Sequence, residues 1–262
     1  MSSPSGDIRV RLSWAKQQLE ALDLESTRVL SKTYRVIGEP YGDSTDVWRY
    51  LVKVVRKGKE PPFADWAFMA GDIAHNLHAS LDNLAWALAG RFAHGGTAFP
   101  LTDCKEKWAQ ATHSTKRHKA KTYGMGATVV NIVHGFQPYT DRKNFQLGVL
   151  RDLSNEDKHR IVQLTAVAGF LGSVGFGKVR GPKMLSVPYV RPAGSFQDDT
   201  VLGRVEVSAG VKVKPHVTLE VAFAEGTVAA YRPVLTGLRG VTKMIETEIL
   251  PALEGYIPAA HQ

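Results

Sequence analysis

The residues best suited to chemistry lie on one face of a helix that the sequence predicts over residues 71–88. At 3.6 residues per turn, one side of this helix is apolar and carries Ile73, Leu77, Leu81, Leu84 and Leu88. The opposite side, centred on Ala79, carries short polar residues: Asp72, His75, Asn76, Asp82 and Asn83. A solvated helix face is usually filled with Lys, Glu, Gln and Arg, which are better helix formers. The short polar residues on this face therefore indicate either a functional site or an internal hydrogen-bond network.

A second polar cluster lies at residues 153–160, which read Leu-Ser-Asn-Glu-Asp-Lys-His-Arg. Ser154 is followed three residues later by Asp157, which resembles a capping box. We therefore expect a helix to break here and to restart as a second helix that continues to residue 167. The restarted helix would direct free backbone N–H groups at a ligand. Asp157 and His159 are candidates for a second arm of the site.

A histidine that is positioned by an aspartate can transfer a proton near neutral pH, and an arginine or a helix N-terminus can hold a phosphate. Cleavage of RNA needs groups of this kind. The catalytic candidates are His75, Asp82 and His159, and the candidates for binding in the two clusters are Asp72, Asn76, Asp157 and Arg160.

Two other interpretations of these residues stay open. A metal-dependent hydrolase would use Asp72, His75, Asp82, Asp157 and His159, because carboxylates and imidazoles bind zinc, manganese or iron between helices. No His-Glu-x-x-His element is present, so no metal ligand and no cofactor is assigned. In the other interpretation the polar residues pair with one another and lock two helices together without any chemistry. His78 lies off the centre of the face, and we expect it to be structural.

The most basic stretch covers residues 103–121, in a chain whose formal net charge is +8. Lys116, Arg117 and Lys119 are candidate phosphate contacts, and Trp108 and Tyr123 are groups on which bases could stack. The alternative is a solvated helix and loop that carries part of the net charge. Nucleic acid is the partner that the charge favours, assembly with a second copy of the chain stays open, and a membrane is not expected.

A mixture of helices and strands must position these residues. Helices are predicted over 7–35, 64–92, 126–135, from 144 onward, and over 228–254, the last with Pro233 in its first turn. Strands are predicted over 47–55, 184–190, 201–207 and 211–223, with a hairpin turn at Ala209-Gly210. We expect an α+β fold, in which a helical bundle packs with a small antiparallel sheet. If strand 47–55 joins the later strands, residues 1–262 form a single interleaved domain, helical over about 1–168 and containing strands and the last helix over about 169–262.

Composition and missing motifs exclude several classes of protein. No apolar run reaches the roughly 18 residues needed to span a bilayer, and the first residues do not resemble a signal peptide, so we expect a cytoplasmic protein. Cys104 is the only cysteine, which excludes an intrachain disulfide and a cysteine-rich zinc site. Dinucleotide-binding glycine loops, Walker loops and Gly-x-Ser-x-Gly elbows are absent.

The order of several short motifs resembles a widespread family of uncharacterised bacterial proteins. The motifs are Gly71-Asp72, His75-Asn76-Leu77, Leu81-Asp82, Phe99-Pro100, Gln137-Pro138-Tyr139 and Asp157-Lys158-His159-Arg160. They cover residues 70–165 and imply no established activity.

The Arg-x-x-x-x-His spacing of that family is similar to the signature of HEPN-type helical RNases. This chain has His78 and Asn83 at those two positions, so it lacks the HEPN-like catalytic pair. The resemblance favours an RNA- or nucleotide-associated protein of a bacterial or phage defence type. The two departures favour binding without that pair, and whether the chain is an enzyme is left open.

Overall fold

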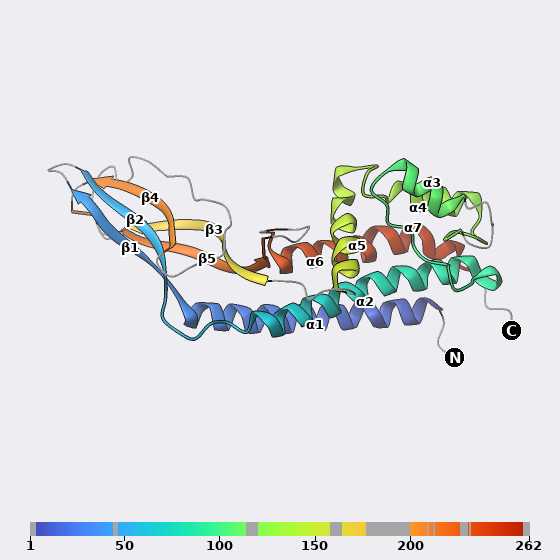
Figure 1. The fold of residues 1–262 in the computed structure, drawn as a ribbon, viewed down its shortest axis with the longest axis horizontal. Coiled ribbons are helices and arrows are strands. Elements are labelled where there is room, and N and C mark those ends of the chain that lie inside the picture. Colours follow the sequence, from blue (N-terminus) through green and yellow to red (C-terminus); the bar gives the residue numbers. More distant parts are fainter. Residues whose placement is uncertain are drawn as a thin grey trace. The chain divides into compact units, whose positions relative to one another are not determined.

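The computed structural model describes residues 4–43, 47–113, 120–157, 164–176, 200–208, 210–211, 213–225, 230 and 232–258. Helices and small antiparallel sheets make up this part of the chain (Figure 1), which confirms the α+β prediction. The chain folds into two compact units, and each is assembled from separated stretches of sequence. The helical unit contains Met1–Ala21, Ala67–Val162 and Leu235–Gln262, and the sheet unit contains Leu22–Trp66 and Gln163–Val234. That the two units form a single domain stays a prediction.

Two long helices contain residues of both units. Helix α1 (Pro4–Thr33) begins in the helical unit and ends in the sheet unit, and α2 (Phe63–Ala89) begins in the sheet unit and ends in the helical unit. Within the helical unit, α1 buries one stripe of side chains: Ile8, Leu12, Ala15 and Leu19. The predicted apolar side of α2 is confirmed, because Ile73, Leu77, Leu81, Leu84 and Leu88 are all buried. A short 3₁₀ turn, η1 (Gly90–Phe92), follows α2. Gly90 begins it with φ of 56°, a left-handed conformation that glycine adopts without steric cost.

The middle of the helical unit consists of short helices joined by loops. They are α3 (Lys105–Thr112), α4 (Ala127–Gly135), the 3₁₀ turn η3 (Arg142–Asn144) and α5 (Phe145–Asp157). The helix predicted over residues 126–135 is thereby confirmed. Trp108 of α3 and Val129 and Val133 of α4 are buried, so each of these helices turns one side toward the core of the unit.

The C-terminal helix begins at Val234 and not at residue 228. Pro233 precedes this helix instead of lying in its first turn, because its backbone forms an isolated antiparallel bridge with Ala222. Between α6 (Val234–Met244) and α7 (Leu250–Leu253), a π-helical turn, η4 (Ile245–Ile249), widens the helix. Pro251 explains this turn, since proline has no N–H to donate and its ring clashes with a regular helical carbonyl four residues earlier. A last 3₁₀ turn, η5 (Glu254–Tyr256), ends the helical part.

The sheet unit contains two antiparallel sheets (Figure 1). One has the order β1 (Tyr34–Asp43), β2 (Val47–Arg56) and β4 (Thr200–Ser208), and the other pairs β3 (Leu164–Phe176) with β5 (Val213–Phe223). Because β2 pairs with β4, the first predicted strand does join the later ones. Alternate residues of β2 form the core side, where Val52 and Val54 are buried and the hydroxyl of Tyr50 donates to the carbonyl of Val211 at 3.1 Å.

Several local predictions in the sheet unit are wrong. Residues 34–43 form β1, so the first helix ends at Thr33 and not at residue 35, and residues 34–43, for which no strand was predicted, pair with β2. Residues 164–167 belong to β3 and not to a restarted helix, because β3 pairs with β5 along its whole length. The turn at Gly210 joins no hairpin, since β4 pairs with β2 while β5 pairs with β3. The strand predicted over 184–190 lies outside the described residues.

Candidate functional site

The polar face of α2 splits into exposed residues and residues that hold neighbouring segments. Asp72 and His75 are exposed and make no hydrogen bond or ion pair with any residue that the structure describes. Asn76 donates from Nδ2 to Oε1 of Gln18 on α1, at 3.3 Å. These contacts do not bring the candidate side chains of α2 together around a cavity.

Asp82 serves as an anchor for the loop after α2. Its Oδ1 accepts a hydrogen bond from the backbone N–H of Phe99 at 2.9 Å, and its Oδ2 lies 3.4 Å from Nδ1 of His78. Phe99 is buried at 1% exposure, so the carboxylate satisfies a backbone donor that the core would otherwise leave without a partner. The contact with Asp82 supports the structural role expected of His78. The assignment of Asp82 to catalysis stays a prediction, together with those of His75 and His159.

Several of the other predicted site residues lie outside the described residues. They are Lys116, Arg117 and Lys119 of the basic stretch and His159 and Arg160 of the second cluster. Asp157 ends α5, and its side chain is also outside the described part. Among the described residues there is no group of three or more His, Cys, Asp and Glu side chains that could hold a metal ion.

Gln137 locks the Phe99-Pro100 segment to α4. Its side chain is fully buried, and its Nε2 donates to the carbonyls of Pro100 at 2.8 Å and Val133 at 3.0 Å. Its Oε1 accepts from both the backbone N–H and the hydroxyl of Thr102, each at 3.0 Å. Both ends of the amide are thus satisfied, as a buried polar group requires. The Phe-Pro and Gln-Pro-Tyr motifs therefore include contacts that stabilise the fold.

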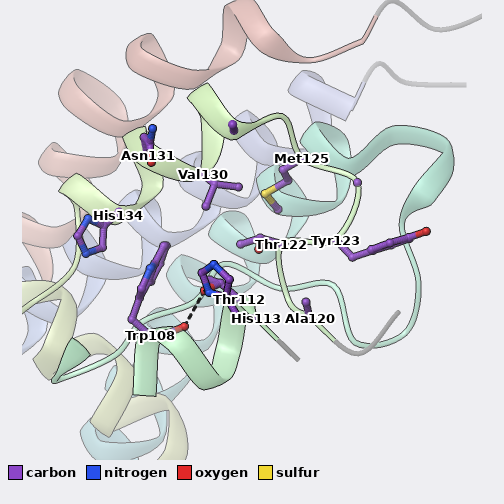
Figure 2. Close-up of a pocket in the computed structure, with 12 residues that line it drawn as sticks. Trp108, Thr112, His113, Ala120, Thr122, Tyr123, Met125, Val130, Asn131 and His134 are labelled. Atoms are coloured by element: carbon purple, nitrogen blue, oxygen red, sulfur yellow. Dashed lines mark hydrogen bonds between the residues drawn. The ribbon is translucent and has the colours of Figure 1, made fainter. Parts of the chain in front are cut away.

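A pocket of about 620 Å³ lies between α3, α4 and the loop that connects them (Figure 2). Its volume falls within the range of about 300 to 1,000 Å³ that is usual for small-molecule sites. The described residues that line it are Trp108, Thr112, His113, Ala120, Thr122, Tyr123, Gly124, Met125, Ala127, Val130, Asn131 and His134. The pocket thus includes both residues that the sequence suggested for base stacking, Trp108 and Tyr123.

One wall of the pocket is formed by the rings of Trp108 and His134, and Tyr139 lies behind it. The ring of His134 lies 4.9 Å from that of Trp108, and its Nε2 lies 2.8 Å from the hydroxyl of Tyr139. Burial raises the pKa of Tyr139, and the negative charge of the nearby Glu106 raises it further. The phenol therefore keeps its proton at neutral pH and remains available as a hydrogen-bond partner for the imidazole. Tyr139 and Trp108 together fix the position of His134.

The second imidazole of the pocket is fixed by Thr112. The hydroxyl of Thr112 donates to the backbone carbonyl of Trp108 at 2.9 Å, which uses its single hydrogen. Nδ1 of His113 lies 2.8 Å from the same oxygen, so this contact requires that Nδ1 carries the proton and donates. Nε2 of the neutral ring is then a hydrogen-bond acceptor. His113 thus brings one acceptor of defined tautomer to the lining.

None of the described lining residues is Asp, Glu, Lys or Arg. The lining combines flat rings, which present π faces, with hydroxyl, amide and imidazole groups, which form directional hydrogen bonds. Such a pocket suits a planar ring with polar edges. Asn131 is exposed on α4 and makes no hydrogen bond with any described residue, so its amide is available to such a ligand.

The sequence did not single out His113, His134 or Asn131, because the cavity forms only when α3, α4 and the loop that connects them fold against one another. A weaker signal was present. Trp108 and Thr112 are four residues apart, so they fall on one side of α3, and His134 precedes the Gln-Pro-Tyr motif that supplies its partner Tyr139.

No family model, curated protein or solved structure matches this chain. Along the described ranges, none of the helices is both long enough and apolar enough to cross a bilayer. The function is therefore argued from the geometry of the pocket and from the charge of the chain.

Proposed function

We propose that this chain binds RNA or a nucleotide and holds a base in the pocket between α3 and α4. The observation that carries the proposal is the lining of the pocket, where Trp108 and His134 present ring surfaces beside the polar edges of Thr112, His113 and Asn131. Every nucleobase offers a π face for stacking and edge groups for hydrogen bonds, so a lining of this type suits all of them.

The charge of the chain supports the same ligand. The formal net charge of +8 attracts polyanions. The segment of residues 114–119 contains Lys116, Arg117 and Lys119, and the residues that flank it, His113 and Ala120, both line the pocket. Chain connectivity therefore keeps these cations within a few residues of the pocket. Their role as phosphate contacts is part of the proposal.

The proposal concerns binding and assigns no cleavage step. The HEPN-like spacing does not supply a cleavage step, because His78 and Asn83 stand where that signature has its arginine and its histidine. His78 instead contacts Asp82. The wider assignment to a bacterial or phage defence type rests on the family resemblance and stays a prediction, as does a nuclease that uses His75, Asp82 and His159.

The test is equilibrium binding of adenosine and uridine monophosphates and of a labelled single-stranded hexanucleotide at low and moderate salt. We expect Asn131→Ala to weaken binding about fivefold without loss of stability, because it removes one exposed hydrogen-bonding group. Trp108→Leu should weaken binding at least fivefold, the order expected when one stacking ring is lost. Trp14→Leu is the matched control, since Trp14 is 58% exposed on α1 and does not line the pocket.

Affinity for the hexanucleotide should fall as salt rises, because phosphate contacts release counterions. The absence of binding at low salt with protein at about 100 μM, the weak end of non-specific nucleic-acid binding, would refute the proposal. Equal affinity in the wild type and in both pocket variants would refute the location of the site.

A further inference from the structure

An aromatic pair, of which Phe92 is exposed and Tyr123 half-buried, lies directly beside the pocket. The ring of Phe92, in η1, meets the ring of Tyr123 edge-on, with centroids 6.2 Å apart and planes at 81°. Phe92 is 45% exposed, which separates this pair from aromatic pairs that are packed in a core. The imidazole of His94 lies 6.0 Å from the other partner, Tyr123. A large ring surface is therefore open to solvent at this place.

The pair is continuous with the pocket through the loop between α3 and α4. Tyr123 and Gly124 both belong to the pocket lining. Figure 2 shows the ring of Tyr123 extending away from Trp108 and His134. Gly124 has φ of 88°, and a Cβ placed on it would lie only 2.5 Å from Cβ of Phe92. The loop thus passes against η1 so closely that only glycine fits, which places Phe92 next to the pocket.

A cation accompanies the exposed ring. The guanidinium carbon of Arg91 lies 4.9 Å from the centroid of Phe92. Arg91 is exposed and forms no ion pair with any residue in the described ranges. A guanidinium over a ring face can stack on a base or contact a phosphate. Arg91, Phe92 and Tyr123 are called the platform below. It combines a fixed positive charge with ring surface, whereas the described lining of the pocket has no fixed charge.

We propose that the pocket and the platform are two successive base sites for single-stranded nucleic acid. This inference rests on the proposed function and narrows its ligand from any nucleotide to a strand of two or more nucleotides. One base enters the pocket beside Trp108, the neighbouring base stacks on the exposed ring of Phe92 with Tyr123 beside it, and Arg91 contacts the phosphate near the second base. A duplex does not fit this arrangement, because its base faces are covered by their neighbours in the stack.

The test compares ligands that occupy one site with ligands that occupy both. The probes are adenosine monophosphate, single-stranded RNA and DNA hexanucleotides of the same sequence, and the corresponding DNA duplex. In the wild type, a single-stranded hexanucleotide should bind at least tenfold more tightly than the monophosphate, and the duplex should bind more weakly than either single strand. The stronger of the RNA and DNA hexanucleotides identifies the sugar that the site prefers.

The decisive variant is Phe92→Ala, which removes the ring but keeps the Cβ that packs against Gly124. We expect it to weaken hexanucleotide binding roughly tenfold, the order of one base stack, and to leave binding of the monophosphate unchanged. Phe68→Ala is the matched control, because Phe68 is 55% exposed on α2 and belongs to neither site. Arg91→Ala, at an exposed position, provides a second variant and should lower the salt dependence of hexanucleotide binding by about one phosphate contact.

The outcomes separate the two proposals. If neither monophosphate nor hexanucleotide binds, the proposed function fails and this inference fails with it. If the monophosphate binds and the hexanucleotide binds no more tightly, the proposed function stands and the second base site is refuted. The second site is also refuted if Phe92→Ala and Arg91→Ala both leave hexanucleotide affinity unchanged in folded protein, or if Phe92→Ala weakens both ligands equally.

Discussion

The polar face of α2 and the pocket between α3 and α4 show two different ways of placing polar residues. The α2 face gathers Asp, Asn and His along one helix, yet its members act separately: Asp82 holds a loop, Asn76 binds Gln18, and His75 is in solvent. In the pocket, side chains of α3, of α4 and of the loop between them, such as Trp108, His134 and Tyr123, line one cavity. Reactive residue types that cluster along one helix therefore do not by themselves make a site. Convergence of several elements does.

The largest expected effect among three tests of this comparison is on stability, at Asp82. Asp82→Ala should lower the free energy of unfolding by about 1–3 kcal/mol, because the N–H of buried Phe99 loses its acceptor. Affinity for nucleotides should stay unchanged. Urea unfolding followed by circular dichroism measures the first quantity, and the binding assay measures the second.

Asp82→Asn is the control for this experiment, since the amide oxygen can still accept from Phe99 and most of the stability should be kept. A stable Asp82→Ala protein that no longer binds nucleotides would contradict the comparison, because the α2 face would then be a site.

A smaller effect is expected at Tyr139, behind the wall of the pocket. Tyr139→Phe removes the hydrogen bond to His134 and should cost about 1 kcal/mol at neutral pH. Burial raises the pKa of Tyr139, so the folded state keeps its phenolic proton above the ordinary Tyr pKa of about 10, where the unfolded state loses it. Unfolding then releases a proton, and wild-type stability falls as pH rises above that value.

The advantage of the wild type over Tyr139→Phe should therefore shrink between neutral and strongly alkaline pH, as measured by urea unfolding of both proteins. Burial also raises the pKa of Tyr34 and Tyr50. Both tyrosines are present in the wild type and in the variant, so their effect cancels in the difference between the two proteins. A constant difference at all pH values would show that Tyr139 is not held as the structure indicates.

The smallest effect is expected at His75. His75→Ala should change the free energy of unfolding by less than about 0.5 kcal/mol, because the side chain is exposed and has no partner among the described residues. Nucleotide affinity should be the same as in the wild type. A loss of more than about tenfold in affinity would show that the α2 face takes part in nucleotide binding.

Local patterns in the sequence predicted much of the fold. The leucine spacing of α2 predicted the helix and its buried side, and the alternation in residues 211–223 predicted a strand where β5 lies, so both elements could be predicted without knowledge of their partners. β1 was missed because Gly38, Pro40 and Gly42 are residue types that are depleted in strands, although its partner β2 follows it directly. β3 was missed because its partner β5 lies far away in the chain. For β3, the apolar spacing of Leu164 and Val167 suits a helix as well as a strand.

The candidate site was predicted only in part, because some of its residues are brought together only by folding. Trp108 and Tyr123 were proposed as stacking groups from the composition of the basic stretch, and both line the pocket. His134 could not be found in this way, since its position depends on contacts with Trp108 and Tyr139 that only the folded chain creates. Asp82 was a candidate because of its residue type. Its hydrogen bond with Phe99 could not be predicted, because the loop between the two residues has no periodic pattern.

The buried amide of Gln137 has a consequence for hydrogen exchange. The N–H of Thr102 is bonded to Oε1 of Gln137, while Nε2 of the same side chain is bonded to the carbonyls of Pro100 and Val133. Deuterium can therefore reach the Thr102 amide only when Gln137 withdraws, and that withdrawal also breaks its bond to α4. We expect the exchange rate of the Thr102 amide to report how often this opening occurs.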